Sequence, residues 1–64
     1  MVILDTQECS TLLYYINTNW TVIKNSPEHY NKYVEGNFEE KLEIGHRVIF
    51  TFEDYKFLKK LTKL

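Results

Sequence analysis

Residues 47–54 read RVIFTFED and residues 55–64 read YKFLKKLTKL. In the first segment Val48, Phe50 and Phe52 recur at every second position, which is the period of a half-buried β-strand. In the second segment the apolar residues recur three or four positions apart, which is helical spacing. The opposite face of this helix carries Lys56, Lys59, Lys60 and Lys63. The sequence therefore predicts a strand followed by a basic amphipathic helix.

A second strand is predicted immediately before the first one. Residues 42–44 read LEI and alternate in polarity, and they lead into Gly45 and His46. A glycine followed by another residue fits a two-residue hairpin turn. Residues 40–44 and 47–53 would then pair as antiparallel strands, which gives a C-terminal hairpin over about residues 40–53.

The first third of the chain predicts a helix that begins after Asp5. Glu8 lies three residues further on, so the two acids form a capping-box pattern, and Leu4 and Cys9 occupy the positions of a hydrophobic staple. The apolar stripe of this helix would consist of Cys9, Leu12, Leu13, Ile16 and Trp20.

A β-hairpin is the alternative for the same region. It would join residues 12–16 (LLYYI) to residues 20–24 (WTVIK), which are rich in strand-forming residue types. Residues 12–16 show no alternation, however, so we favour a helix to about residue 18. Residues 20–24 would follow it as a short strand or an extended connection.

A second helix is expected to start after Asn25-Ser26-Pro27. Serine can cap a helix, and proline suits the first helical position because its missing N–H would be unpaired there. Gly36 would end the helix as a C-cap. The apolar face of the helix would consist of Tyr30, Tyr33 and Val34.

Together these elements predict one small α+β domain that spans residues 1–64. A two- or three-stranded antiparallel sheet would be packed by two or three short helices. The ten aromatic residues would supply most of the core, which is thin in a chain of 64 residues. An open sheet edge would permit homodimerisation, which would enlarge this core.

Several classes of protein are disfavoured by composition. Cys9 is the only cysteine, so no internal disulfide can form, and this favours an intracellular, cytoplasmic site of action. The apolar run after Met1 is too short for a signal peptide, and no run is long enough to span a membrane. Two isolated glycines exclude a phosphate-binding loop.

Catalytic and metal chemistry have little support in the sequence. Cys9, His29 and His46 are too widely spaced for a usual zinc motif, so we expect no metal and no cofactor. Cys9 falls on the predicted buried stripe, where a thiol is inert. A minimal nuclease that uses His29 or His46, with Arg47 on phosphate, is the weakest of our hypotheses, and we expect no enzyme.

Charge and exposed aromatics point instead to binding. Residues 1–54 carry nine acids and four bases, a sum of −5, whereas residues 55–64 carry four lysines and no acid, a sum of +4. The lysines either form a solvated helix face or bind an acidic partner. The acidic residues 1–54 could instead mimic nucleic acid toward a basic partner. Tyr14 and Tyr15 fall off the apolar stripe of the first helix, and Tyr55 lies at the edge of the stripe of the last helix. These three tyrosines are therefore expected at a protein interface.

RNA or DNA binding is the alternative function. Lysines interleaved with aromatic rings can hold phosphates while the bases stack. The residues expected to carry it are Arg47, Lys56, Lys59, Lys60 and Lys63.

The segment VIFTFEDYKFLKKL at residues 48–61, in a short chain rich in Asn, Tyr, Lys and Ile, resembles the small accessory proteins of large tailed phages. This resemblance implies a non-enzymatic protein that binds its target stoichiometrically in the host cytoplasm. Such proteins inhibit or redirect host RNA polymerase, nucleases, CRISPR effectors or the toxins of defence systems. The resemblance therefore implies a host protein as the partner.

Overall fold

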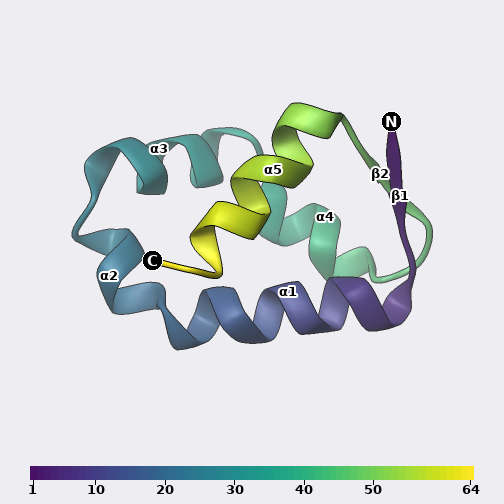
Figure 1. The fold of residues 1–64 in the computed structure, drawn as a ribbon, viewed down its shortest axis with the longest axis horizontal. Helices are drawn as coiled ribbons and strands as arrows, with labels where there is room; N and C mark the ends of the chain where they lie inside the picture. The colour runs from purple at the N-terminus through teal and green to yellow at the C-terminus, as the bar shows by residue number, and fades with distance from the viewer.

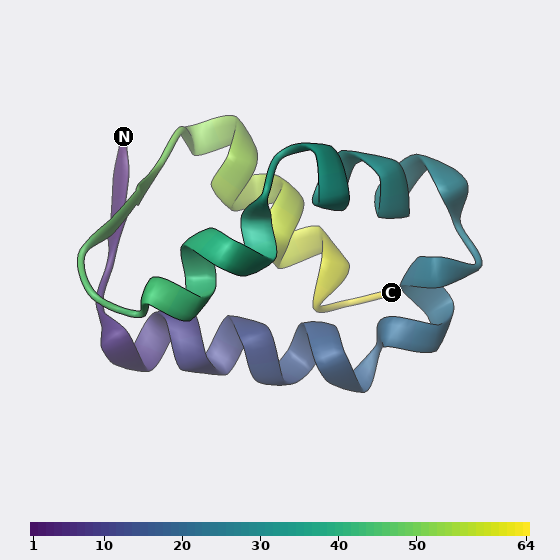
Figure 2. The same ribbon diagram turned by 180° about the vertical axis from the view of Figure 1, so that it is seen from behind.

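The computed structural model describes all 64 residues and shows an α+β fold of five helices and one two-stranded sheet. The elements are β1 (Val2–Leu4), α1 (Thr6–Thr18), α2 (Trp20–Lys24), α3 (Pro27–Glu35), α4 (Phe38–Ile44), β2 (Val48–Phe50) and α5 (Phe52–Leu61). The strands lie at one end of the molecule, α2 and α3 lie at the other, and α5 crosses between them (Figure 1). Seen from behind, α4 packs along α1 (Figure 2). The α+β class predicted from sequence is confirmed.

The sheet differs from the predicted hairpin. β2 pairs antiparallel with β1, so that Ile3 lies opposite Ile49 and Leu4 lies opposite Val48. Leu4 and Val48 point into the core, whereas Ile3 and Ile49 are exposed on the outer face. The prediction that residues 40–44 pair with residues 47–53 was therefore wrong, because the partner of β2 is the start of the chain.

Residues 38–44 form the helix α4 instead of the predicted strand. Phe38 and Leu42 lie one helical turn apart and are both buried, while Ile44 is exposed. Glu39 and Glu40 occupy the first turn, where negative charge favours the helix dipole. Gly45 does not form a hairpin turn but ends α4 with a left-handed backbone (φ 65°), which glycine adopts without strain.

Residues 20–24 are also helical, as α2, and not extended. Asn19 separates α2 from α1, and its side-chain amide donates hydrogen bonds to the carbonyl oxygens of Leu61 and Thr62 at 3.2 and 3.0 Å. These bonds fix the C-terminal end of α5 against the junction of α1 and α2. Long-range contacts of this kind override the strand propensity of residues such as Val22 and Ile23.

The predicted start of α1 is confirmed, and so is the choice of helix over hairpin. The Asp5 side chain accepts from the Glu8 backbone N–H at 2.8 Å, and the Glu8 side chain accepts from the Asp5 N–H at 3.5 Å. Both arms of the capping box are therefore present. Leu4 and Cys9, the predicted staple residues, are both fully buried.

The second predicted helix is present as α3, with Pro27 at its start and Gly36 at its end. Its predicted apolar face is only partly buried, because Tyr33 enters the core whereas Tyr30 and Val34 are exposed. Gly36 is required by close packing. A Cβ at this position would fall against the ring of Phe38, 2.8 Å from its Cδ2 atom.

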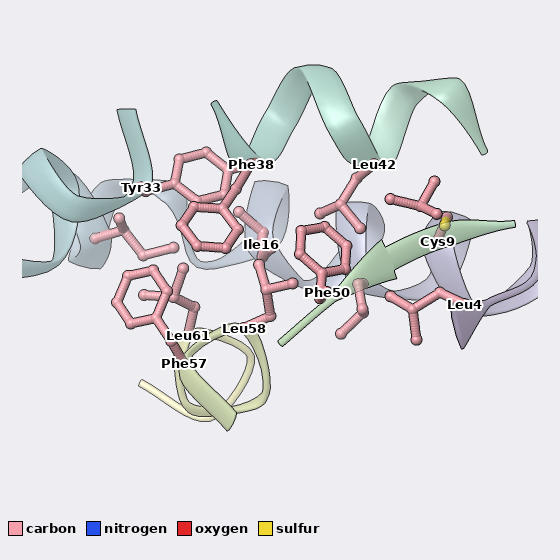
Figure 3. Packing of buried hydrophobic residues seen from close by; sticks show 13 residues of the cluster. Leu4, Cys9, Ile16, Tyr33, Phe38, Leu42, Phe50, Phe57, Leu58 and Leu61 are labelled. Carbon is pink, nitrogen blue, oxygen red and sulfur yellow. The ribbon is translucent and has the colours of Figure 1, made fainter. Parts of the chain in front are cut away.

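The aromatic part of the core is centred on Phe38, which is 3% exposed (Figure 3). Its ring centroid lies 6.0 Å from that of Tyr33, 5.7 Å from that of Phe50 and 5.4 Å from that of Phe57. These four rings come from α3, α4, β2 and α5, so one aromatic cluster joins four elements. Half of the eight buried leucine, isoleucine and valine side chains come from α1 and α5, and these are Leu12, Ile16, Leu58 and Leu61.

Candidate binding surface

The helix α5 has a buried side and a cationic side, as its sequence predicts. Phe57, Leu58 and Leu61 are buried. The side-chain oxygen of Thr51 caps the helix by accepting from the Asp54 backbone N–H at 3.1 Å. This cap starts the helix at Phe52, so Phe52 does not continue the strand as predicted. Its ring is 61% exposed.

A shallow hollow of about 330 Å³ lies on the exposed side of α5. We call it the lysine hollow. It is lined by Phe52, Tyr55, Lys56, Lys59, Lys60 and Lys63. The Lys56 Nζ atom lies 5.5 Å from the centroid of the Phe52 ring, close enough for a cation–π contact. The lining contains no acidic residue, so the surface joins an apolar ring to four positive charges.

A second hollow of about 280 Å³ lies between α1 and α5 and shares Tyr55 and Lys59 with the lysine hollow. Its other side is formed by α1 and contains the carboxylates of Asp5 and Glu8. The two acids of the capping box therefore lie next to the cationic surface. Tyr55, which is half-buried, lines both hollows.

The lysines of the predicted site come together, but Arg47 does not join them. Arg47 precedes β2, whereas the lysine hollow begins at Phe52 after that strand. Phe52 is a surface residue that we did not predict. The pattern Thr51-x-x-Asp54 could have indicated its position, because a capping threonine at residue 51 starts the helix at residue 52 and ends the strand before it.

The predicted interface tyrosines are divided between two helices. Tyr14 and Tyr15 are exposed on α1, with their ring centroids 5.4 Å apart in an edge-to-face pair. Neither lines the lysine hollow, whereas Tyr55 does. The role of these three tyrosines in binding stays a prediction.

The histidines lie in different surroundings. His29 is half-buried, its Nδ1 atom is 2.7 Å from the Ser26 hydroxyl, and its ring stacks on Phe57. His46 is exposed in the loop between α4 and β2. No group of three His, Cys, Asp or Glu side chains is arranged to hold a metal ion.

Cys9 is fully buried on the core side of α1. Burial raises the pKa of its thiol, and the nearby carboxylates of Asp5 and Glu8 raise it further. A thiol in this setting has little thiolate character, which is the form that acts as a nucleophile.

No helix of the protein combines the length and the apolar character that crossing a bilayer requires. No protein-family model, curated protein or solved structure matches the chain.

Proposed function

We propose that this protein is a non-enzymatic, phage-type accessory protein that binds a host macromolecule and thereby inhibits or redirects it. The lysine hollow is the docking surface in this proposal. The observation that carries the proposal is the placement of Phe52, largely exposed, among four lysines with no acid in the lining. The partner is a host protein with an acidic surface, and binding takes place in the host cytoplasm.

Phe52 supplies the apolar anchor of the proposed interface. Burying a phenylalanine side chain contributes about 1.5–3 kcal/mol. Aromatic residues of this kind dominate interface energetics when a partner covers them. The surrounding lysines would steer an acidic partner to this face and set its orientation, which speeds association more than it raises affinity.

Single-stranded nucleic acid is the second candidate partner, and the composition of the hollow favours it. Phe52 and Tyr55 offer rings for base stacking, and the four lysines can neutralise phosphates. Four phosphate contacts to a single strand give a slope of log K against log salt of about −2.8. Each Lys→Gln change in the hollow would make that slope shallower by about 0.7. The acidic remainder of the chain opposes a long polyanion.

A pull-down from host lysate with the tagged protein, with and without nuclease, separates the two candidates. A protein captured in both halves supports the leading proposal. Capture that depends on intact nucleic acid supports the second candidate, which is binding to single-stranded nucleic acid. If neither a protein nor nucleic acid is captured above the level of an untagged control, the proposed function is wrong.

The anchor is tested with a matched pair of exposed apolar residues. Phe52 in the hollow is 61% exposed, and Ile44 at the end of α4 is 67% exposed and lines neither hollow. We expect Phe52→Ala to weaken the complex by about ten-fold or more, from the burial value above. Ile44→Ala should leave the affinity within about three-fold. Equal effects of the two variants would place the interface elsewhere.

A further inference from the structure

A third hollow, of about 320 Å³, lies where α2 and α3 meet the start of α4. We call it the aromatic–acidic pocket. It is lined by Trp20, Tyr30, Tyr33, Val34, Asn37, Glu39 and Glu40. None of these residues lines the lysine hollow. The proposed function therefore leaves this pocket unexplained.

Three aromatic rings form the apolar part of the pocket. The Trp20 centroid lies 5.8 Å from that of Tyr30 and 5.7 Å from that of Tyr33, and the ring planes are inclined by 57° and 64°. The Trp20–Tyr30 pair is tilted and the Trp20–Tyr33 pair is edge-to-face, so neither pair is stacked face to face. Trp20 is half-buried and Tyr30 is exposed, whereas Tyr33 is anchored in the core.

The polar part of the pocket is negative. Glu39 and Glu40 lie in the first turn of α4, and the lining contains no basic residue. Neither carboxylate takes part in any of the eight side-chain hydrogen bonds of the protein. Burial raises the pKa of the Tyr33 hydroxyl, and the nearby carboxylates of Glu39 and Glu43 raise it further.

We propose that the aromatic–acidic pocket binds one organic cation, the guanidinium or ammonium group of an arginine or lysine side chain on a partner protein. Aromatic faces attract such cations, and tryptophan attracts them most strongly. The carboxylates of Glu39 and Glu40 supply the negative charge that balances the cation. The volume of the pocket is at the low end for ligand pockets, which suits a single side chain. An inorganic cation would leave the three rings unused, and an uncharged apolar group would leave the carboxylates unpaired.

The test uses Trp20, which is the only tryptophan of the chain and a wall of the pocket. The resonance of its indole N–H is followed by NMR while N-acetyl-arginine amide is added to the full-length protein. N-acetyl-citrulline amide is the control probe, because it has a similar shape and no charge. N-acetyl-lysine amide shows which of the two cationic side chains is preferred.

We expect the arginine probe to shift the indole resonance saturably with a Kd in the millimolar range, as suits a single contact. The citrulline probe should cause no saturable shift. The double variant E39Q/E40Q should bind the arginine probe about ten-fold more weakly. The variant E28Q/E35Q removes two acids from α3 that lie outside the pocket, and it should bind as the wild type does.

Three results would overturn the proposal: no saturable shift with either cationic probe, equal binding of the citrulline probe, or unchanged binding by E39Q/E40Q. Both glutamates are exposed, so the double variant should fold, and its amide spectrum checks this. If it unfolds, the single variants Glu39→Gln and Glu40→Gln give the same comparison. The result does not depend on the lysine hollow, whose variants should retain pocket binding.

Discussion

Replacing Phe38 tests the account of the core at its centre. The ring is almost completely buried and contacts the rings of Tyr33, Phe50 and Phe57. Phe→Ala in a core lowers the free energy of unfolding by about 3–5 kcal/mol. A domain of 64 residues has a total of about 3–10 kcal/mol, so Phe38→Ala should leave a large unfolded fraction.

Phe38→Leu provides a variant that should remain folded and measurable. It keeps most of the apolar volume but loses three ring pairs, which contribute about 0.5–1.5 kcal/mol each. The three pairs sum to about 1.5–4.5 kcal/mol, and the contacts of the new leucine offset part of this loss. We therefore expect urea unfolding followed by circular dichroism to show a loss of about 1–3 kcal/mol. Phe52→Ala is the control, and because Phe52 is largely exposed its effect should stay below about 0.5 kcal/mol.

The comparison between Phe38 and Phe52 can refute the structure directly. The hairpin predicted from sequence would point Phe52 inward beside Phe50, whereas the structure buries Phe38 and exposes Phe52. If Phe52→Ala destabilises the protein more than Phe38→Leu, or if Phe38→Ala lowers the free energy of unfolding by less than about 1 kcal/mol, the arrangement of α4 and β2 described here is wrong.

Three further predictions concern single sites and the response to pH. Gly36→Ala should destabilise the protein by about 1–3 kcal/mol in urea unfolding, because the added methyl group meets the Phe38 ring, and an unchanged midpoint would contradict that packing. Asp5→Ala removes the carboxylate that accepts from the Glu8 N–H and should lower the free energy of unfolding, measured by urea unfolding, by about 1 kcal/mol. Asp5→Asn keeps a side-chain oxygen at the cap and should retain most of this stability. Burial raises the pKa of the Cys9 thiol above its usual 9.0 in the folded protein, so stability should be complete below pH 9 and fall as the pH rises above it. Cys9→Ser lacks the thiol but keeps every other titrating group, so a wild-type alkaline loss no greater than that of Cys9→Ser would show that the thiol does not contribute.

The helices α1 and α5 could be predicted from sequence because their signals are local. The capping box of Asp5 and Glu8 and the spacing of the apolar residues lie within one or two turns, where sequence patterns report structure directly. The same holds for Pro27 at the start of α3. Each of these segments has one side buried and one side exposed, which makes its period clear.

The strand pairing and α4 could not be predicted, and the reasons are physical. Three alternating residues at 42–44 do not distinguish a strand from a helix. Phe38, whose burial together with Leu42 shows the helical period, lies outside the strand predicted over residues 40–44. The partner of β2 is at the other end of the chain, and no local pattern specifies such a pairing. Asn19 likewise contacts the end of α5, which the sequence gives no means to foresee.

The candidate surfaces follow the same division. The lysines of α5 share one helix face, so the sequence alone placed them together, and only the addition of Phe52 required the structure. The aromatic–acidic pocket combines residues of α2, α3 and α4. The sequence pattern predicts a short strand or an extended connection at residues 20–24 and a strand at residues 40–44, and neither prediction brings these residues into a pocket. A site formed by residues from several elements can be identified only from the tertiary structure.

The most direct test of docking through the lysine hollow compares two variants of equal charge. One replaces the four lysines of the hollow with glutamine, and the other replaces the four remaining bases, which are Lys24, Lys32, Lys41 and Arg47. Each variant changes the net charge from −1 to −5, because four positive charges are removed in both. Circular dichroism is needed to check that both variants are folded, because Lys32 and Lys41 lie over the core rings of Phe57 and Phe50 and the second variant removes these contacts. We predict that the first variant loses capture of the host partner while the second retains it, and an equal loss in both, or retention in both, would contradict the account.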